Sequence, residues 1–148
     1  MSYVPMDQRI VDELARIVAL VPGIDDVQSE PYVSAPRVDC AVEIDDDEES
    51  GIQHSKGKRG ASLNVKLRMF RRVSPSDDES PRASMRALLY AIRWRLAQCD
   101  IQQFPPGTRE ITVGGRTFFN PQEGSHYAMA EMPVSVQFSE TFNEETQP

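Results

Sequence analysis

The chain has 148 residues, of which 39% are hydrophobic and 26% are charged, and its formal net charge at pH 7 is −7. This length fits one domain with a single core, and this composition lies outside the disordered, collagenous and membrane classes. The negative charge opposes nonspecific binding of phosphate backbones, so nucleic acid is not an expected partner of the surface as a whole.

No apolar run reaches the roughly 20 residues that a membrane helix requires. The first residues also lack the basic flank, apolar stretch and small-residue cleavage site of a secretory signal. We therefore expect a protein that is made and used in a cytosol, with no membrane partner. Cys40 and Cys99 are too few for a disulfide scaffold or a zinc site, and both are expected as reduced, buried thiols.

The first predicted element is an amphipathic helix that is capped by Asp7 and ended by Pro22-Gly23. Its apolar residues recur at helical spacing and form one face, which is expected to cover a sheet. These residues are Ile10, Val11, Leu14, Ile17, Val18 and Val21.

Two strands are predicted next, after a proline-bounded turn at residues 31–36. Residues 37–45 and 61–69 both alternate between apolar and polar side chains, which is typical of half-buried strands. The two strands are expected to be antiparallel neighbours, because sequential strands usually pair. Residues 45–60 are predicted as an extended or mobile loop, and loops of this length tend to be functional or disordered.

A second amphipathic helix is predicted after a polar turn at residues 74–81. The apolar stripe that would pack on the same sheet consists of Met85, Leu88, Leu89, Ile92, Leu96 and Cys99. The other flank carries four arginines and an aromatic pair, namely Arg82, Arg86, Arg93, Arg95, Tyr90 and Trp94. This flank is either a solvated face or a docking surface for a neighbouring subunit.

Residues 110–119 are predicted as two short strands that Gly114-Gly115 joins in a tight hairpin. Residues 128–138 form the last predicted strand. Pro133 lacks a backbone donor, so this strand is expected at a sheet edge or bulged there. Residues 143–148 are expected to be a frayed tail. The whole order predicts a single α+β domain of two layers, with two amphipathic helices on one face of a mainly antiparallel sheet.

Motifs for catalysis or ligand binding are incomplete. Residues 51–59 resemble a phosphate-binding loop, but the two glycines are too far apart and Arg59 stands where a Ser or Thr would bind the metal. The acidic run that starts at Asp45 lacks the glycine and glutamate positions of a calcium loop. His54 and His126 have no metal-ligand spacing and are expected at the surface. We therefore predict no enzyme activity, no cofactor and no metal.

The order of the predicted elements resembles that of a known protein family. An early amphipathic helix is followed by APRVDCAVEIDDDEE, ASLNVKLRMFRRV, SMRALLYAIRWRLAQ and YAMAEMPVSVQFSETF. In this order, over roughly residues 7–142, the chain resembles the tail terminator, or tail completion, proteins of long-tailed bacteriophages.

The resemblance implies a structural virion protein without catalytic residues. Its subunits would form a ring, a homo-hexamer, at the head-proximal end of the tail tube, where they stop tube polymerisation and provide the head-docking surface. The implied partners are other copies of the chain, the tail tube protein and the head–tail connector or neck proteins, with DNA only passing through the lumen. Assembly would take place in the host cytoplasm. The alternatives are another neck, head-completion or connector subunit, or a small soluble enzyme.

Each interface of a cyclic ring joins two different patches. We expect one patch in the charged segment and its complement on the second helix. The first consists of Asp45, Asp46, Asp47, Glu48, Glu49, Lys56, Lys58 and Arg59, and the second of Arg82, Arg86 and Arg93. The alternative for the charged segment is a solvated hairpin tip, since exposed charge pairs contribute little individually.

Overall fold

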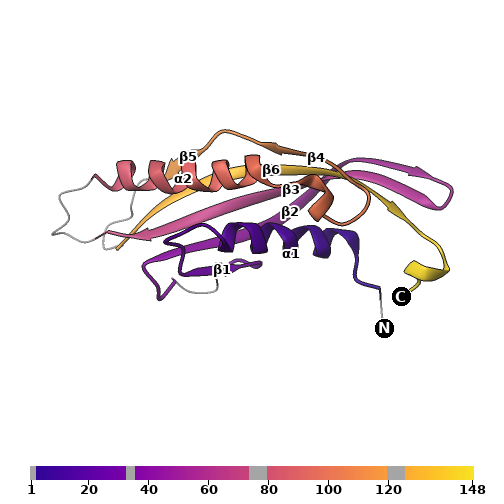
Figure 1. Cartoon of the computed structure of the whole chain (residues 1–148), viewed down its shortest axis with the longest axis horizontal. Coiled ribbons are helices and arrows are strands. Elements are labelled where there is room, and N and C mark those ends of the chain that lie inside the picture. Colours follow the sequence, from indigo (N-terminus) through magenta and orange to yellow (C-terminus); the bar gives the residue numbers. More distant parts are fainter. Residues whose placement is uncertain (1–2, 33–35, 74–79, 120–125) are drawn as a thin grey trace.

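The computed structural model describes residues 3–32, 36–73, 80–119 and 126–148. In this part of the chain, helices α1 (Met6–Ala19) and α2 (Pro81–Gln98) cover one face of a six-stranded sheet (Figure 1). The strands are β1 (Asp26–Gln28), β2 (Cys40–Ser55), β3 (Lys58–Arg72), β4 (Thr108–Val113), β5 (Thr117–Phe119) and β6 (Tyr127–Thr141), and the short 3-10 helices are η1 (Ile101–Gln103) and η2 (Glu144–Thr146). The predicted α+β class with two helices on one face is confirmed. Residues 33–35 and 74–79 of the two predicted turns lie outside the described residues.

The sheet has the order β1-β2-β3-β6-β4, and β5 also pairs with β6. β1 runs parallel to β2, whereas every other pair among the described strands is antiparallel. β3 pairs with β6 along its whole length, from Lys58 opposite Thr141 to Arg72 opposite Tyr127. These two strands therefore form the centre of the sheet.

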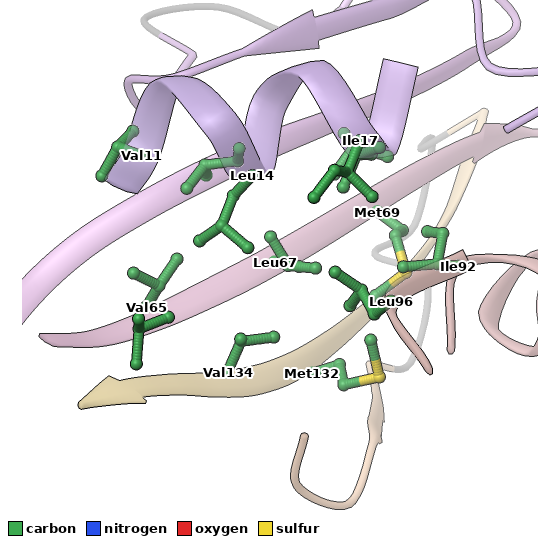
Figure 2. Packing of buried hydrophobic residues seen from close by; sticks show 14 of the residues in the cluster. Val11, Leu14, Ile17, Val65, Leu67, Met69, Ile92, Leu96, Met132 and Val134 are labelled. Atoms are coloured by element: carbon green, nitrogen blue, oxygen red, sulfur yellow. The ribbon is translucent and has the colours of Figure 1, made fainter. Parts of the chain in front are cut away.

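The core lies between the helices and this centre. Figure 2 shows Val11, Leu14 and Ile17 of α1 facing the β3 side chains, with Ile92 and Leu96 of α2 close to Met132 of β6. The predicted apolar faces of both helices belong to this cluster, although Cys99 at the end of α2 is only half-buried. Neither α-helix of the described chain is long and apolar enough to cross a membrane.

α1 begins one residue earlier than its predicted cap, because the cap comes from another part of the chain. Asp7 lies within the first turn, where its carboxylate accepts from the Gln8 amide at 2.8 Å. The Met6 amide instead donates to Glu140 Oε1 of β6 at 3.1 Å. A carboxylate at this position also interacts favourably with the helix dipole. The prediction that Asp7 caps the helix is therefore wrong.

Most of segment 45–60, predicted as a loop, is a β-hairpin. β2 continues to Ser55 and β3 begins at Lys58, so the turn consists of Lys56 and Gly57. Gly57 has φ +72°, a conformation that glycine adopts without steric cost. The loop prediction failed because acidic residues are poor strand formers by themselves, whereas pairing with a partner strand holds them in this hairpin.

β4 and β5 do not form the predicted hairpin with each other. Both pair with β6, β4 with residues 134–138 and β5 with residues 129–131. The ladder is interrupted opposite Pro133, which has no amide proton to donate. The Gly114 amide donates to the Pro133 oxygen at 2.8 Å, and a Cβ on Gly114 would lie 2.6 Å from Pro133 Cγ. Gly114 is thus needed for close approach to Pro133. The prediction of an edge strand or a bulge at Pro133 is wrong, because β6 is an inner strand that pairs with β3 without a register shift at Pro133.

Residues 143–148, predicted as a frayed tail, contain the short helix η2. The Asn143 side chain accepts from the Thr146 amide at 3.1 Å, and the Asn143 amide donates to Thr146 Oγ1 at 2.9 Å. This reciprocal pair is a capping box.

Candidate functional site

The tip of the β2–β3 hairpin, which we call the arm, comprises residues 50–58. Figure 1 shows it projecting past the ends of both helices. Every residue from Gly51 to Lys58 is exposed, including the apolar Ile52, which is 49% exposed. The arm therefore contributes no buried side chain to the core. His54 in the arm and the distant His126 are both exposed, which confirms that the histidines lie at the surface.

The predicted acidic residues divide into two groups. Asp45 and Glu49 face cations of the adjacent strand: Asp45 lies 3.7 Å from Arg68, and Glu49 lies 2.8 Å from Arg59. Asp46 and Glu48 are exposed, and the Asp47 side chain lies outside the described residues. The first group therefore stabilises the hairpin, and Glu48 is the acidic residue best placed for an outside partner.

Arg59 is predicted as part of the same contact patch. Its side chain instead lies at the end of the core, close to the first turn of α1. Its guanidinium lies 2.8 Å from Glu49 and 3.0 Å from Glu140, and it stacks over Phe138 at 5.5 Å. Because Glu140 also accepts from the first amide of α1, these contacts join the helix to β2, β3 and β6. Lys56 and Lys58, by contrast, are exposed on the arm.

The sheet face away from the helices carries an ion-pair row that sequence reasoning missed. Arg68 of β3 pairs with Glu43 of β2 and lies 3.1 Å from Glu131 of β6. Glu43 is only 2% exposed, and its other oxygen accepts from the Tyr32 amide at 2.7 Å. The three charged residues occupy outward positions in register across the strands. The alternation along each strand already predicts that the three residues face outward. To predict that they pair with one another, the register between the strands is also needed.

The exposed side of α2 presents arginines followed by aromatic residues. Arg82, Arg86, Tyr90 and Trp94 follow one another at intervals of four residues and are all exposed, Tyr90 by 70% and Trp94 by 50%. Side chains at this spacing lie on one face of a helix. We call these four residues the α2 stripe. The predicted Arg93 lies beside this stripe and is half-buried.

Three guanidinium groups gather around one ring at the start of α2. Arg116 lies 4.0 Å from the centroid of Phe118, Arg82 lies 5.5 Å away and Arg86 lies 5.7 Å away. We call this group the Phe118 cluster. Sequence reasoning missed Arg116 and Phe118, because their position beside α2 depends on how β5 pairs with β6 beyond Pro133.

A cavity of about 160 Å³ adjoins the Phe118 cluster. Apart from Arg82 its lining is apolar or aromatic, from Val73, Pro81, Met85, Phe118, Phe119, Tyr127, Ala128 and Met129. Phe119 is itself 41% exposed. The site thus combines positive charge with an apolar recess, which suits a ligand that carries both an acid and an apolar group.

The acidic and basic patches are separated within one chain. α1 packs near β1 and β2, whereas α2 packs near β6. Among the described residues, no ion pair joins residues 45–49 to the arginines of α2.

The two cysteines are free thiols. Cys40 is 3% exposed, as predicted, and Cys99 is half-buried. Burial raises the pKa of both thiols, which disfavours the reactive thiolate. In the described part of the chain, no group of three or more His, Cys, Asp or Glu residues is arranged to hold a metal ion.

The sequence matches no protein-family model and no curated protein. A solved structure with a similar arrangement of elements is a chain of the virion of a native gene transfer agent particle. That chain is 12% identical, and the alignment covers 90% of this chain and 94% of the other with a TM-score of 0.46. A likeness at this level does not by itself assign a function to this chain.

Proposed function

We propose that the chain is a structural subunit of a phage-like virion and, more specifically, a tail terminator. Copies would form a ring, a hexamer in the family that the sequence resembles, at the head-proximal end of the tail tube. There the ring would stop tube growth and present the surface on which the head docks.

The observation that carries the proposal is the arm. A hairpin end whose residues 51–58 are all exposed adds nothing to the core of its own subunit, yet it extends the molecule well past its helices (Figure 1). The exposed side chains of this projection are available for contact with a neighbouring subunit. The exposed apolar Ile52 and the charged Lys56 and Lys58 give the arm groups for such a contact.

The arrangement of charge supports a ring. In a cyclic assembly one patch of each subunit meets a different patch of the next. The arm and Glu48 would form one patch, and the α2 stripe with Arg93 would form the other. The large aromatic side chains of the stripe resemble the residues that dominate binding energy at many interfaces. A net charge of −7 also suits a channel through which DNA passes without being held.

Another neck or connector subunit remains the second candidate, because the same surfaces would serve a ring on the head side of the junction. The two roles differ in which assembly step fails when the protein is missing. A terminator acts on the tail, whereas a head-completion protein acts on the filled head.

The test is electron microscopy of particles made with and without the gene, with the gene supplied on a plasmid as the control. The proposal predicts overlong or headless tails in its absence and normal tails after complementation. Tails of normal length, combined with defective DNA-filled heads, would support the neck subunit. Normal particles would overturn both roles.

A further inference from the structure

The Phe118 cluster brings three positive charges close to one another. Arg82, Arg86 and Arg116 share one ring, and none of them forms an ion pair with a described acidic residue. A ring face attracts each cation, but like charges this close also repel one another. An anion beside the cluster would relieve that repulsion. The adjoining apolar cavity adds a place for an apolar anchor.

The chain itself contains a segment with the complementary groups. Phe142 is 52% exposed, and the exposed Glu144 and Glu145 follow it in η2. The Phe142 amide donates to the Gly57 oxygen at 2.8 Å, which fixes the start of the segment beside the turn of the arm. The capping box of Asn143 orders the residues that follow. An aromatic anchor is thus presented next to two carboxylates on a short, ordered turn.

The two parts lie at opposite ends of the molecule. Figure 1 shows the C-terminal segment at one end of the long axis, whereas α2 begins at the other end beside β5. One copy therefore cannot bring its own Phe142 to its own Phe118 cluster. Two copies arranged head to tail can do so, and this is the heterologous contact that a ring requires.

We propose that residues 142–148 of one copy dock on the Phe118 cluster of the next copy. Phe142 enters the cavity, while Glu144 and Glu145 face the three guanidinium groups. The size is suitable, since a cavity of about 150 Å³ is known to hold a benzene ring, and this one measures about 160 Å³. The inference rests on the self-assembly part of the proposed function and names the partner of one of its surfaces.

The first experiment measures binding of a fluorescent, C-terminally amidated peptide of residues 142–148 to the full chain by anisotropy. The R86Q/R116Q variant should bind the peptide about tenfold more weakly, because two exposed charged contacts are lost. R37Q, which removes an exposed arginine elsewhere, is the matched control and should bind like the unmodified chain. Peptides with Phe142→Ala or with Glu144→Gln and Glu145→Gln should also bind weakly. Equal binding by all variants, or none by the unmodified chain, would overturn the proposal.

The second experiment exchanges charges between the two sides within the full chain. Sedimentation velocity should show that R86E weakens self-assembly and that adding E145R restores it, whereas R37E has no effect. Failure of E145R to restore assembly would contradict direct contact. Residues 77–79, also acidic, precede α2 in sequence and are the competing source of charge. If D77N/D78N/E79Q abolishes the effect of R86E, the cluster serves its own chain and the proposal is wrong.

The terminator role and the contact between copies are tested independently by these experiments. Overlong tails in the absence of the gene, together with no peptide binding, would keep the terminator role and remove this contact. Peptide binding together with normal tails would keep the contact and remove the terminator role.

Discussion

At the scale of single residues, Gly107 has the least freedom to change among the described glycines. Its φ is +103°, and a Cβ there would lie 2.3 Å from the backbone oxygen of Ser139. Gly107→Ala is therefore expected to lower the free energy of unfolding by at least about 2 kcal/mol, from backbone strain and the displaced strand. Gly115→Ala is the matched control, since its Cβ would meet nothing within 4 Å. Urea unfolding of both variants measures the difference, and equal midpoints would contradict the account.

Arg59 is expected to matter for stability rather than only for assembly. Arg59→Met leaves Glu49 and the 7% exposed Glu140 without their shared cation. Removing one partner of a buried pair costs about 3 kcal/mol or more, although the partial exposure of Arg59 reduces this value. Lys58→Met also removes one positive charge, but from an exposed side chain at the preceding position. This variant should have nearly the same free energy of unfolding as the unmodified chain. Thermal and urea unfolding would refute the prediction if the two variants were equally stable.

The cysteines give a prediction about pH. Burial raises the pKa of Cys40 above its ordinary value of 9.0, so the folded state disfavours the thiolate. The resulting stabilisation is fully present below pH 9 and is lost as the pH rises above that value. At pH 8 the native thiols should react slowly with a disulfide reagent, with the half-buried Cys99 ahead of Cys40, and rapidly in urea. Fast labelling of Cys40 in the folded protein would contradict this prediction, because it would show that the thiol is accessible.

Sequence reasoning identified the apolar residues well but missed the buried charges. The buried positions of α1, such as Leu14, follow from a periodicity that is visible in the sequence. Glu43 and Glu140 are also buried. An acidic residue is normally expected at the surface, and its burial can be predicted only when its charged partners are known. Those partners, Arg68 and Arg59, belong to other strands, so only the sheet register identifies them.

At the scale of elements, the arm is expected to serve contact rather than folding. A triple variant should leave the free energy of unfolding unchanged to within about 0.5 kcal/mol, as is usual for surface substitutions. It combines Glu48→Ser, Lys56→Ser and Lys58→Ser. The same triple variant should weaken self-assembly in sedimentation velocity. An Asp45→Ser and Glu49→Ser variant should instead lose stability, because these residues face Arg68 and Arg59. Normal assembly by the triple variant would remove the arm from the interface.

The helices and the long strands could be predicted because their apolar residues recur at regular spacing. The arm and the β4–β5 region could not be predicted, for two different reasons. The arm has no buried side chains, so no apolar pattern marks residues 51–55 as strand. Gly114-Gly115 resembled a hairpin turn, but neither glycine has positive φ, and Pro133 explains the interruption instead.

At the scale of the whole molecule, the layered α+β architecture follows from the order of periodic segments, whereas the function does not. The predicted Asp45 and Arg59 turned out to be engaged within their own chain. The predicted Arg82 and Arg86 belong to a larger site, whose other members are Phe118 of β5 and Arg116, which directly precedes β5. A contact surface is assembled from distant segments, and a single sequence gives no register that would join them.

In the proposed function, the chain sits at the junction of tail and head. Electron microscopy of purified particles can locate copies of the chain that carry a gold label at Arg37→Cys, an exposed position outside the proposed contact surfaces. Because Cys40 and Cys99 are expected to react slowly, the unmodified chain serves as the labelling control. The account predicts gold at the head-proximal end of the tail on most particles. Gold on the capsid or along the tube, or particles that contain none of the chain, would contradict it.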